Sequence, residues 1–215
     1  MAKAPAKSSP TKTVAKTVVA APEIVTTIEP APLKQFSQSG AEGFTFTRYW
    51  WEGEGPREGI TPWIQKKLKP GDDPNFGACA KAEVLLSATT PSIYADLAFL
   101  IEHFDDELPR HERNAMVQVK LALDPEEPWH AGYEQVRGFA RAHFVSQHLP
   151  VILVAHVPSV GGLNGYGPHV HCIVLSRPIN INGLLGANYR LCSDTGYAEA
   201  LAAWQAWTAG EEEGA

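Results

Sequence analysis

The stretch "NGYGPHVHCIVLSRPI" (residues 164–179) joins a glycine-rich turn to a mostly apolar run that carries two histidines one residue apart. The run over residues 168–176 is typical of a buried β-strand. Because side chains alternate between the two faces of a strand, His169 and His171 are expected to project from the same face. Imidazoles are uncommon in the interior of a strand, so this pair calls for a functional explanation.

A second apolar run, "PVILVAH" (residues 150–156), ends on a third histidine, His156. If the two runs form neighbouring antiparallel strands, His156 lies at the same end of the sheet as His169. Three neutral imidazoles can hold a divalent metal ion and leave coordination positions open for a substrate. The alternative is a structural role for each histidine. We assign that role to the other five: His103, His111, His130, His143 and His148.

The rest of the chain alternates between short strands and helices. "VQVKLAL" (residues 117–123) has the alternation of a half-buried strand, with Gln118 and Lys120 among the residues opposite its apolar side. Helical apolar spacing is found in residues 91–107, 124–144 and 193–207, whereas residues 52–80 are rich in Gly, Pro and Lys and are expected to be irregular. This mixed order predicts an α+β fold.

With 215 residues the chain is long enough for one well-buried domain, which we place at residues 23–209. Residues 1–22 are predicted to be a disordered basic tail, and residues 210–215 a short acidic tail. The net charge is −6 although the first 22 residues contain four lysines and no acid, so the domain itself is acidic. Such a charge gives nucleic-acid binding no general electrostatic help.

The composition also predicts the compartment. No apolar run reaches the roughly 18 residues needed to span a membrane. The three cysteines are widely spaced and include no CxxC pair, which fits a reducing compartment. We therefore expect a cytoplasmic protein.

The segments "AHVPS" and "NGYGPHVHCIVLSRPI" together resemble the His-hydrophobe-His motif of the MobA/MobL relaxases, members of the HUH endonuclease superfamily that nick single-stranded DNA. His156 matches the histidine that ends a strand shortly before the family motif, and Arg177 matches an arginine that often closes the motif strand. Residues 89–126 are similar to the family's helix, its E-x-R-x-A stretch and the strand after it. Residues 189–207 are similar to the helix that follows the motif. The likeness covers about residues 23–209.

This resemblance implies an HUH relaxase-like fold, with a largely antiparallel central sheet and flanking helices. It implies that His156, His169 and His171 bind Mg²⁺ or Mn²⁺. A tyrosine would attack a phosphodiester of single-stranded DNA at a transfer origin, join the 5′ phosphate covalently and leave a free 3′ hydroxyl, for plasmid mobilisation. Accessory mobilisation proteins are further expected partners.

The resemblance makes Tyr49, in "FTRYWWEG", the candidate nucleophile, because family relaxases carry this tyrosine on the first helix after the first strand. "EIVTTIEP" (residues 23–30) would be that strand. The alternative is that Tyr49 belongs to a packed aromatic run with Trp50 and Trp51; Tyr166, in the loop beside the histidines, could also touch substrate. Glu83 stands where the family commonly has an acidic residue and could orient an imidazole, or be an exposed strand glutamate.

The sequence departs from the family pattern in its acidic domain and in the order of Arg48 and Tyr49, since the arginine precedes the tyrosine. Two further functions therefore stay open. One is a non-catalytic relaxase-like module that only binds DNA. The other is a histidine-metal phosphodiesterase that uses metal-bound water and no tyrosine.

Overall fold

The computed structural model describes residues 30–41, 43–53, 55–70, 79–161 and 167–212. The tail at residues 1–22 and nearly all of the strand expected at 23–30 lie outside this part of the chain. In chain order the elements are β1 (Leu33–Ala41), β2 (Phe44–Trp51), α1 (Thr61–Leu68), β3 (Lys81–Leu85), η1 (Ser92–Ala95), α2 (Leu97–Asp106), β4 (Asn114–Ala122), α3 (Trp129–His143), η2 (Val145–Gln147), β5 (Val151–His156), η3 (Pro158–Gly161), β6 (His169–Leu175), β7 (Ile179–Asn180), β8 (Gly183–Leu184) and α4 (Asp194–Glu212).

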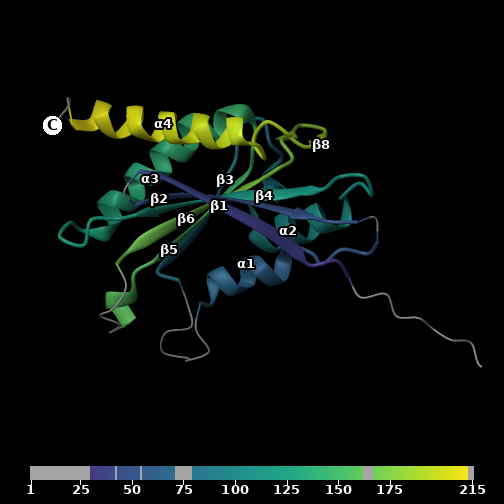
Figure 1. Ribbon diagram of the computed structural model, residues 1–215, viewed down its shortest axis with the longest axis horizontal. Coiled ribbons are helices and arrows are strands. Elements are labelled where there is room, and N and C mark those ends of the chain that lie inside the picture. The colour runs from purple at the N-terminus through teal and green to yellow at the C-terminus, as the bar shows by residue number, and fades with distance from the viewer. Residues whose placement is uncertain (1–29, 42, 54, 71–78, 162–166, 213–215) are drawn as a thin grey trace, which may run out of the picture.

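Six strands form one sheet in the order β1-β2-β4-β6-β5-β3, and every neighbouring pair is antiparallel (Figure 1). The two-residue strands β7 and β8 form a separate small hairpin. The fold is therefore α+β with an antiparallel central sheet and flanking helices, as predicted. The order places β4 and β6, the strand with two of the histidines, in the middle of the sheet.

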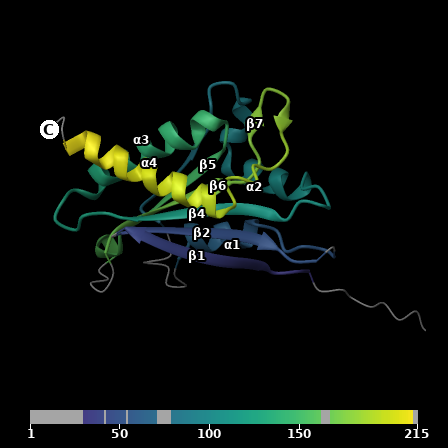
Figure 2. The same ribbon diagram turned by 45° about the horizontal axis from the view of Figure 1, so that its top comes forward.

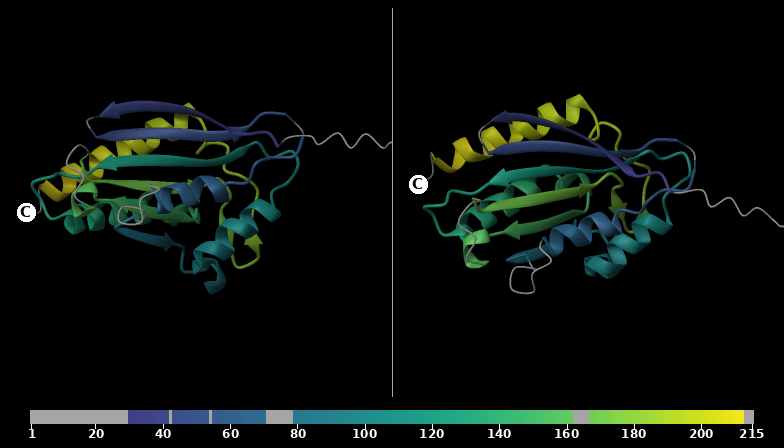
Figure 3. Two further views of the ribbon diagram at one scale, coloured as in Figure 1. Left: turned by 90° about the horizontal axis from the view of Figure 1, so that it is seen from below. Right: turned by 60° about the horizontal axis from the view of Figure 1, so that its bottom comes forward.

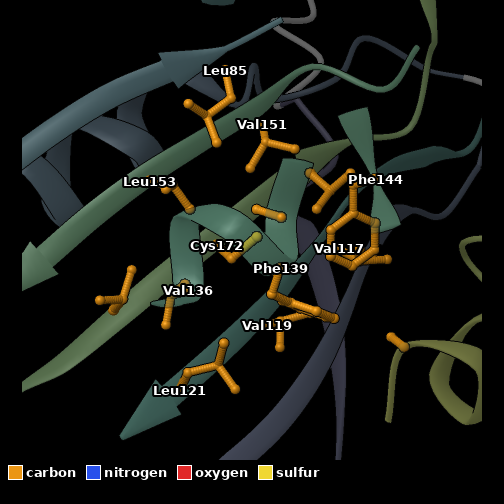
Figure 4. Close-up of a cluster of buried hydrophobic side chains, with 14 of the residues drawn as sticks. Leu85, Val117, Val119, Leu121, Val136, Phe139, Phe144, Val151, Leu153 and Cys172 are labelled. Atoms are coloured by element: carbon orange, nitrogen blue, oxygen red, sulfur yellow. The ribbon is translucent and has the colours of Figure 1, made fainter. Parts of the chain in front are cut away.

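Helices cover both faces of the sheet. Helices α3 and α4 pack on one face (Figure 2), where Val136 and Phe139 of α3 meet Val119 of β4 and Cys172 of β6 in a fully buried cluster (Figure 4). Helices α1 and α2 lie on the other face (Figure 3). Below, these are called the α3 face and the α1 face. No helix in the described ranges is both long and apolar enough to cross a bilayer.

Strand β4 is more deeply buried than its sequence pattern predicts. Residues 115–119 are all buried, and Gln118, expected on the exposed side, is only 6% exposed. The reason is that β4 has a strand on each side and helices over both faces. The predicted alternation holds at Lys120 and Ala122, which are exposed, and fails at Gln118, because hydrophobic alternation cannot reveal a second covered face.

Helix α1 was missed by the sequence pattern, because residues 52–80 were expected to be irregular. Its proline lies in the first turn, where the missing N–H costs little. The carboxylate of Asp105 on α2 accepts hydrogen bonds from the Ile60 and Thr61 amides at 2.9 and 3.2 Å and from the Thr61 hydroxyl at 2.9 Å. The start of this short helix is thus fixed by a residue far along the chain.

Candidate metal centre

The three histidines predicted as ligands lie together at one end of β5 and β6. His156 is the register partner of His169, while His171 lies opposite Val154 on β5 and Lys120 on β4. All three side chains are on the α1 face. The expectation that His156 and His169 share one end of the sheet is confirmed by this register.

The imidazole rings are close enough to share one ion. Their centroids are 4.7 to 5.2 Å apart, and one nitrogen of each ring lies within 4.8 Å of the others. His171 Nε2 lies 3.3 Å from His156 Nδ1. His171 is 4% exposed, and the other two are half-buried.

Backbone carbonyls fix the outward nitrogens of two of the rings. His156 Nε2 lies 2.6 Å from the carbonyl oxygen of Lys67, at the C-terminal end of α1. His169 Nδ1 lies 3.1 Å from the carbonyl oxygen of Gly167. Because a carbonyl only accepts, each of these nitrogens carries the proton, so His156 Nδ1 and His169 Nε2 are unprotonated and have a lone pair that can bind a metal. Ligating histidines commonly have this outer hydrogen bond.

Burial keeps the cluster neutral. It lowers the pKa of all three imidazoles below the usual histidine value, and it lowers the pKa of His171 to about 2, with the charge of Lys67 acting in the same direction. Neutral imidazole is the form that binds metal. The positive charges of Lys67 and Lys120 also lower the pKa of His169 and His171. Two lysine side chains therefore act on the cluster, although the protein as a whole is acidic.

The donor set fits a divalent metal. Three imidazole nitrogens this close together could hold one divalent ion. Mg²⁺ and Mn²⁺, the two ions predicted from the sequence, are both usually bound through oxygen ligands, so the imidazoles do not favour one of them over the other.

Tyr49 lies on strand β2, not on a helix as the family pattern led us to expect. It is 4% exposed, and its ring packs edge-on against Trp63 of α1 with the centroids 4.8 Å apart. Burial raises its pKa to about 12, and a hydrogen bond with Thr47 acts in the opposite direction. The phenol is therefore protonated and shielded in this conformation.

The sheet register separates Tyr49 from the histidines. Tyr49 pairs with Met116, whereas His171 pairs with Lys120, and Lys120 in turn with Thr45. Tyr49 is thus displaced from His171 by four residues along the strand direction, about 13 Å, and by two strands across the sheet, about 10 Å. Tyr49 and the three histidines do project from the same face of the sheet, the α1 face. The structure brings the histidines together and leaves Tyr49 outside the cluster.

Other residues singled out from the sequence have structural roles. Glu83 lies on the α3 face, where Arg137 and the Tyr133 hydroxyl bond its carboxylate, so it does not orient an imidazole. Arg177 lies beyond the opposite end of β6 and donates to the carbonyls of Glu107 and Leu185 at 2.6 and 2.7 Å. Tyr166 lies outside the described residues.

Sequence reasoning missed Lys67, Gln118 and Lys120 as neighbours of the histidines. Lys67 was hidden because α1 itself was missed. Lys120 and Gln118 become neighbours only through the pairing of β4 with β6. The apolar alternation of β4 already placed Gln118 and Lys120 on the same side of that strand. It did not indicate that β6 would be the neighbouring strand.

No family model and no curated protein matches this sequence. Its fold is similar to a solved structure described as "Molecular Basis of Vancomycin Resistance Transfer in Staphylococcus aureus", with a TM-score of 0.54 and 16% sequence identity over 67% of this chain and 80% of that chain. The two chains therefore share a fold, which here is the α+β arrangement with an antiparallel central sheet and flanking helices that the resemblance predicted. Identity this low establishes the fold alone.

Proposed function

We propose that this protein is a metal-dependent relaxase of the MobA/MobL type that nicks single-stranded DNA at a transfer origin during plasmid mobilisation. The observation that supports this most strongly is the position of the three-histidine cluster at the end of two inner strands of a relaxase-like sheet, with one nitrogen of each ring within 4.8 Å of the others. His156, His169 and His171 would hold Mn²⁺ or Mg²⁺.

A polar path leads away from the cluster across the α1 face. It runs through the exposed Lys120 on β4 to the half-buried Thr45 on β2 and the exposed Ser37 on β1, whereas Thr47 between them is buried and lies with its hydroxyl 2.9 Å from that of Ser37. Hydroxyl and ammonium groups are suited to phosphate oxygens. With Lys67 at the cluster itself, this path gives a DNA strand local positive charge despite the net charge of −6.

The proposed chemistry divides the work between the metal and the protein. When bound, the metal would polarise the scissile phosphate and offset negative charge in the transition state. The three histidines orient it, and Lys67 and Lys120 hold neighbouring phosphates. Tyr49 Oη would form a bond to phosphorus while the bond to the 3′ oxygen breaks; the phenol loses its proton and the 3′ oxygen gains one. Because Trp63 shields Tyr49, this step requires α1 to shift when DNA binds.

The test is a search for a covalent protein–DNA adduct. Protein and Mn²⁺ are incubated with a single-stranded DNA library labelled at the 3′ end, so that the labelled fragment carries the 5′ phosphate. We expect labelled protein that survives a denaturing gel. Tyr49→Phe should reduce the adduct by at least about 100-fold, because the nucleophile is removed, whereas Tyr189→Phe, at an exposed tyrosine, should leave it unchanged.

Other outcomes identify other functions. The burial of Tyr49 favours the phosphodiesterase as the second candidate, which predicts cleaved DNA with no protein attached. An adduct that persists in Tyr49→Phe and maps by mass spectrometry to Tyr166 would support the relaxase function with Tyr166, instead of Tyr49, as the nucleophile. If the folded protein binds DNA without cleaving it, the function would be that of a non-catalytic DNA-binding module.

The finer parts of the proposal rest on the sequence. They are the transfer origin as the DNA site, the accessory mobilisation proteins as partners, and the cytoplasmic location. The domain limits at residues 23 and 209 are likewise predictions.

A further inference from the structure

Two buried polar atoms on the α1 face have no hydrogen-bond partner among the described residues: His171 Nδ1 and Gln118 Oε1. Their residues are 4% and 6% exposed. A buried polar group without a partner costs about 1–3 kcal/mol, so two such atoms on one face of the sheet call for an explanation. His171 belongs to the histidine cluster, and Gln118 lies on β4, the strand that pairs with β6.

The register makes Gln118 and His171 diagonal neighbours. On β4 and β6, Lys120 faces His171 and Gln118 faces Ile173. Because residues two apart share a face of a strand, the Gln118 side chain projects on the same side as His171. Long side chains reach across such a diagonal.

His171 is the one ring of the cluster for which the described residues supply no outer partner. The carbonyls of Lys67 and Gly167 hold the other two. Since His171 Nε2 points to His156, a neutral His171 that binds metal through Nε2 must carry its proton on Nδ1. That N–H group needs an acceptor.

The other polar side chains near Gln118 on this face are poorly suited to accept a hydrogen bond from the His171 Nδ1–H group. Lys120 has only donors on its side chain. The Thr47 hydroxyl lies beyond Gln118 in the same row and is already paired with Ser37. An amide side chain, by contrast, offers a carbonyl oxygen to the N–H of the metal-binding tautomer, and can turn its NH₂ group toward Nδ1 when the proton lies on Nε2.

We propose that Gln118 is the positioning residue of His171: its side-chain carbonyl accepts the Nδ1–H and holds the ring with Nε2 toward the metal. This inference rests on the proposed metal site and adds a residue to it. Gln118 touches neither substrate nor metal. Its effect is on the tautomer and the orientation of a ligand.

The test compares Mn²⁺ affinities of the full chain by electron paramagnetic resonance titration. Gln118→Leu removes the acceptor at similar volume, and we expect a loss of about 10- to 100-fold, the usual effect of removing an outer-shell partner. Gln118→Glu keeps an acceptor and should bind Mn²⁺ at least as tightly as the wild type. Gln38→Leu is the matched control, because Gln38 Oε1 is also buried without a partner among the described residues but lies on β1, away from the cluster.

A second measurement follows the tautomer itself. In the Zn²⁺-loaded wild type, ¹⁵N NMR should show a slowly exchanging Nδ1–H on His171, and this proton should exchange rapidly in Gln118→Leu. Equal affinity and an unchanged proton in folded Gln118→Leu would overturn the inference while leaving the metal site intact. If Gln118→Leu does not fold, a tenfold or greater loss in Gln118→Glu would overturn it. A wild type that binds no Mn²⁺ would instead end the proposed function, and this inference with it.

Discussion

Two polar clusters lie on opposite faces of the sheet near its β3–β5–β6 side, and they differ in how complete they are. On the α3 face, both carboxylate oxygens of Glu83 accept hydrogen bonds from Arg137 at 2.9 to 3.1 Å, and the Tyr133 hydroxyl adds another at 3.3 Å. On the α1 face, three neutral imidazoles point at one another, and one of them has a buried nitrogen without a partner among the described residues.

The difference separates a structural cluster from a ligand site. The Glu83 cluster joins opposite charges and satisfies its own hydrogen bonds, so it needs nothing from outside and serves the fold. The histidine cluster has a single contact among its imidazole nitrogens, at 3.3 Å, and leaves His171 Nδ1 buried without a partner among the described residues. We therefore expect the Glu83 cluster to contribute to stability and the histidine cluster to bind the metal, and each of the following changes is expected to affect only one of the two clusters.

The largest effect is expected from His171→Ala. Losing one of three ligands should lower Mn²⁺ affinity by at least about 100-fold, because two imidazoles hold the ion far less well, and the rise in melting temperature on adding Mn²⁺ should disappear. Titration and thermal unfolding measure both effects. His130→Ala, at an exposed histidine of α3, is the control. Unchanged Mn²⁺ affinity in folded His171→Ala would show that the cluster is not the site.

A smaller effect, on stability alone, is expected from Glu83→Gln. Weakening the contacts with Arg137 should cost about 1 kcal/mol of unfolding free energy, since the pair is partly exposed. Mn²⁺ affinity should stay the same. A change in metal affinity comparable to that in His171→Ala would remove the distinction between the two faces.

The effect of Glu83→Gln should also depend on pH. Hydrogen bonds from Arg137 hold the pKa of Glu83 below its usual value. The stabilisation is therefore fully present above the unfolded-state pKa of about 4.3 and is lost as the pH falls through the lower, folded-state value. Denaturant unfolding from pH 7 to pH 3 should show the wild type and the variant converging at low pH. A difference that grows toward acid would contradict the assignment.

The smallest effect is expected from Lys120→Ala. Removing one phosphate contact should weaken binding to single-stranded DNA a few-fold and reduce the salt dependence by about 0.7 in the log–log slope. Fluorescence anisotropy at several salt concentrations measures both. Lys34→Ala is the matched control, because Lys34 is an exposed lysine on β1 paired with Trp50, on the α3 side. Equal losses of DNA affinity in the two variants would mean that single-stranded DNA does not bind along the α1 face.

Much of the metal site could be predicted from local pattern. Strand periodicity placed His169 and His171 on one face, and the apolar run before them placed His156 at the matching end. Both inferences need only the geometry of a strand and its neighbour.

What could not be predicted depends on distant parts of the chain. Helix α1 is short and rich in lysine, and its start is held by Asp105, so the Lys67 carbonyl that fixes His156 had no local signal. Gln118 is buried because β4 lies in the middle of the sheet. The sequence of β4 alone does not reveal that position. Tyr49 was assigned by analogy with a family pattern, and its strand position shows how weakly a single aromatic residue can be placed in that way.

The most direct measurement is the anomalous scattering of a crystal soaked in Mn²⁺. A single peak in contact with His156 Nδ1, His169 Nε2 and His171 Nε2 is the expected result, with the Gln118 carbonyl turned toward His171 Nδ1. A peak elsewhere in the molecule, or no peak at this cluster in Mn²⁺-saturated crystals, would contradict the assignment of this face as the metal centre.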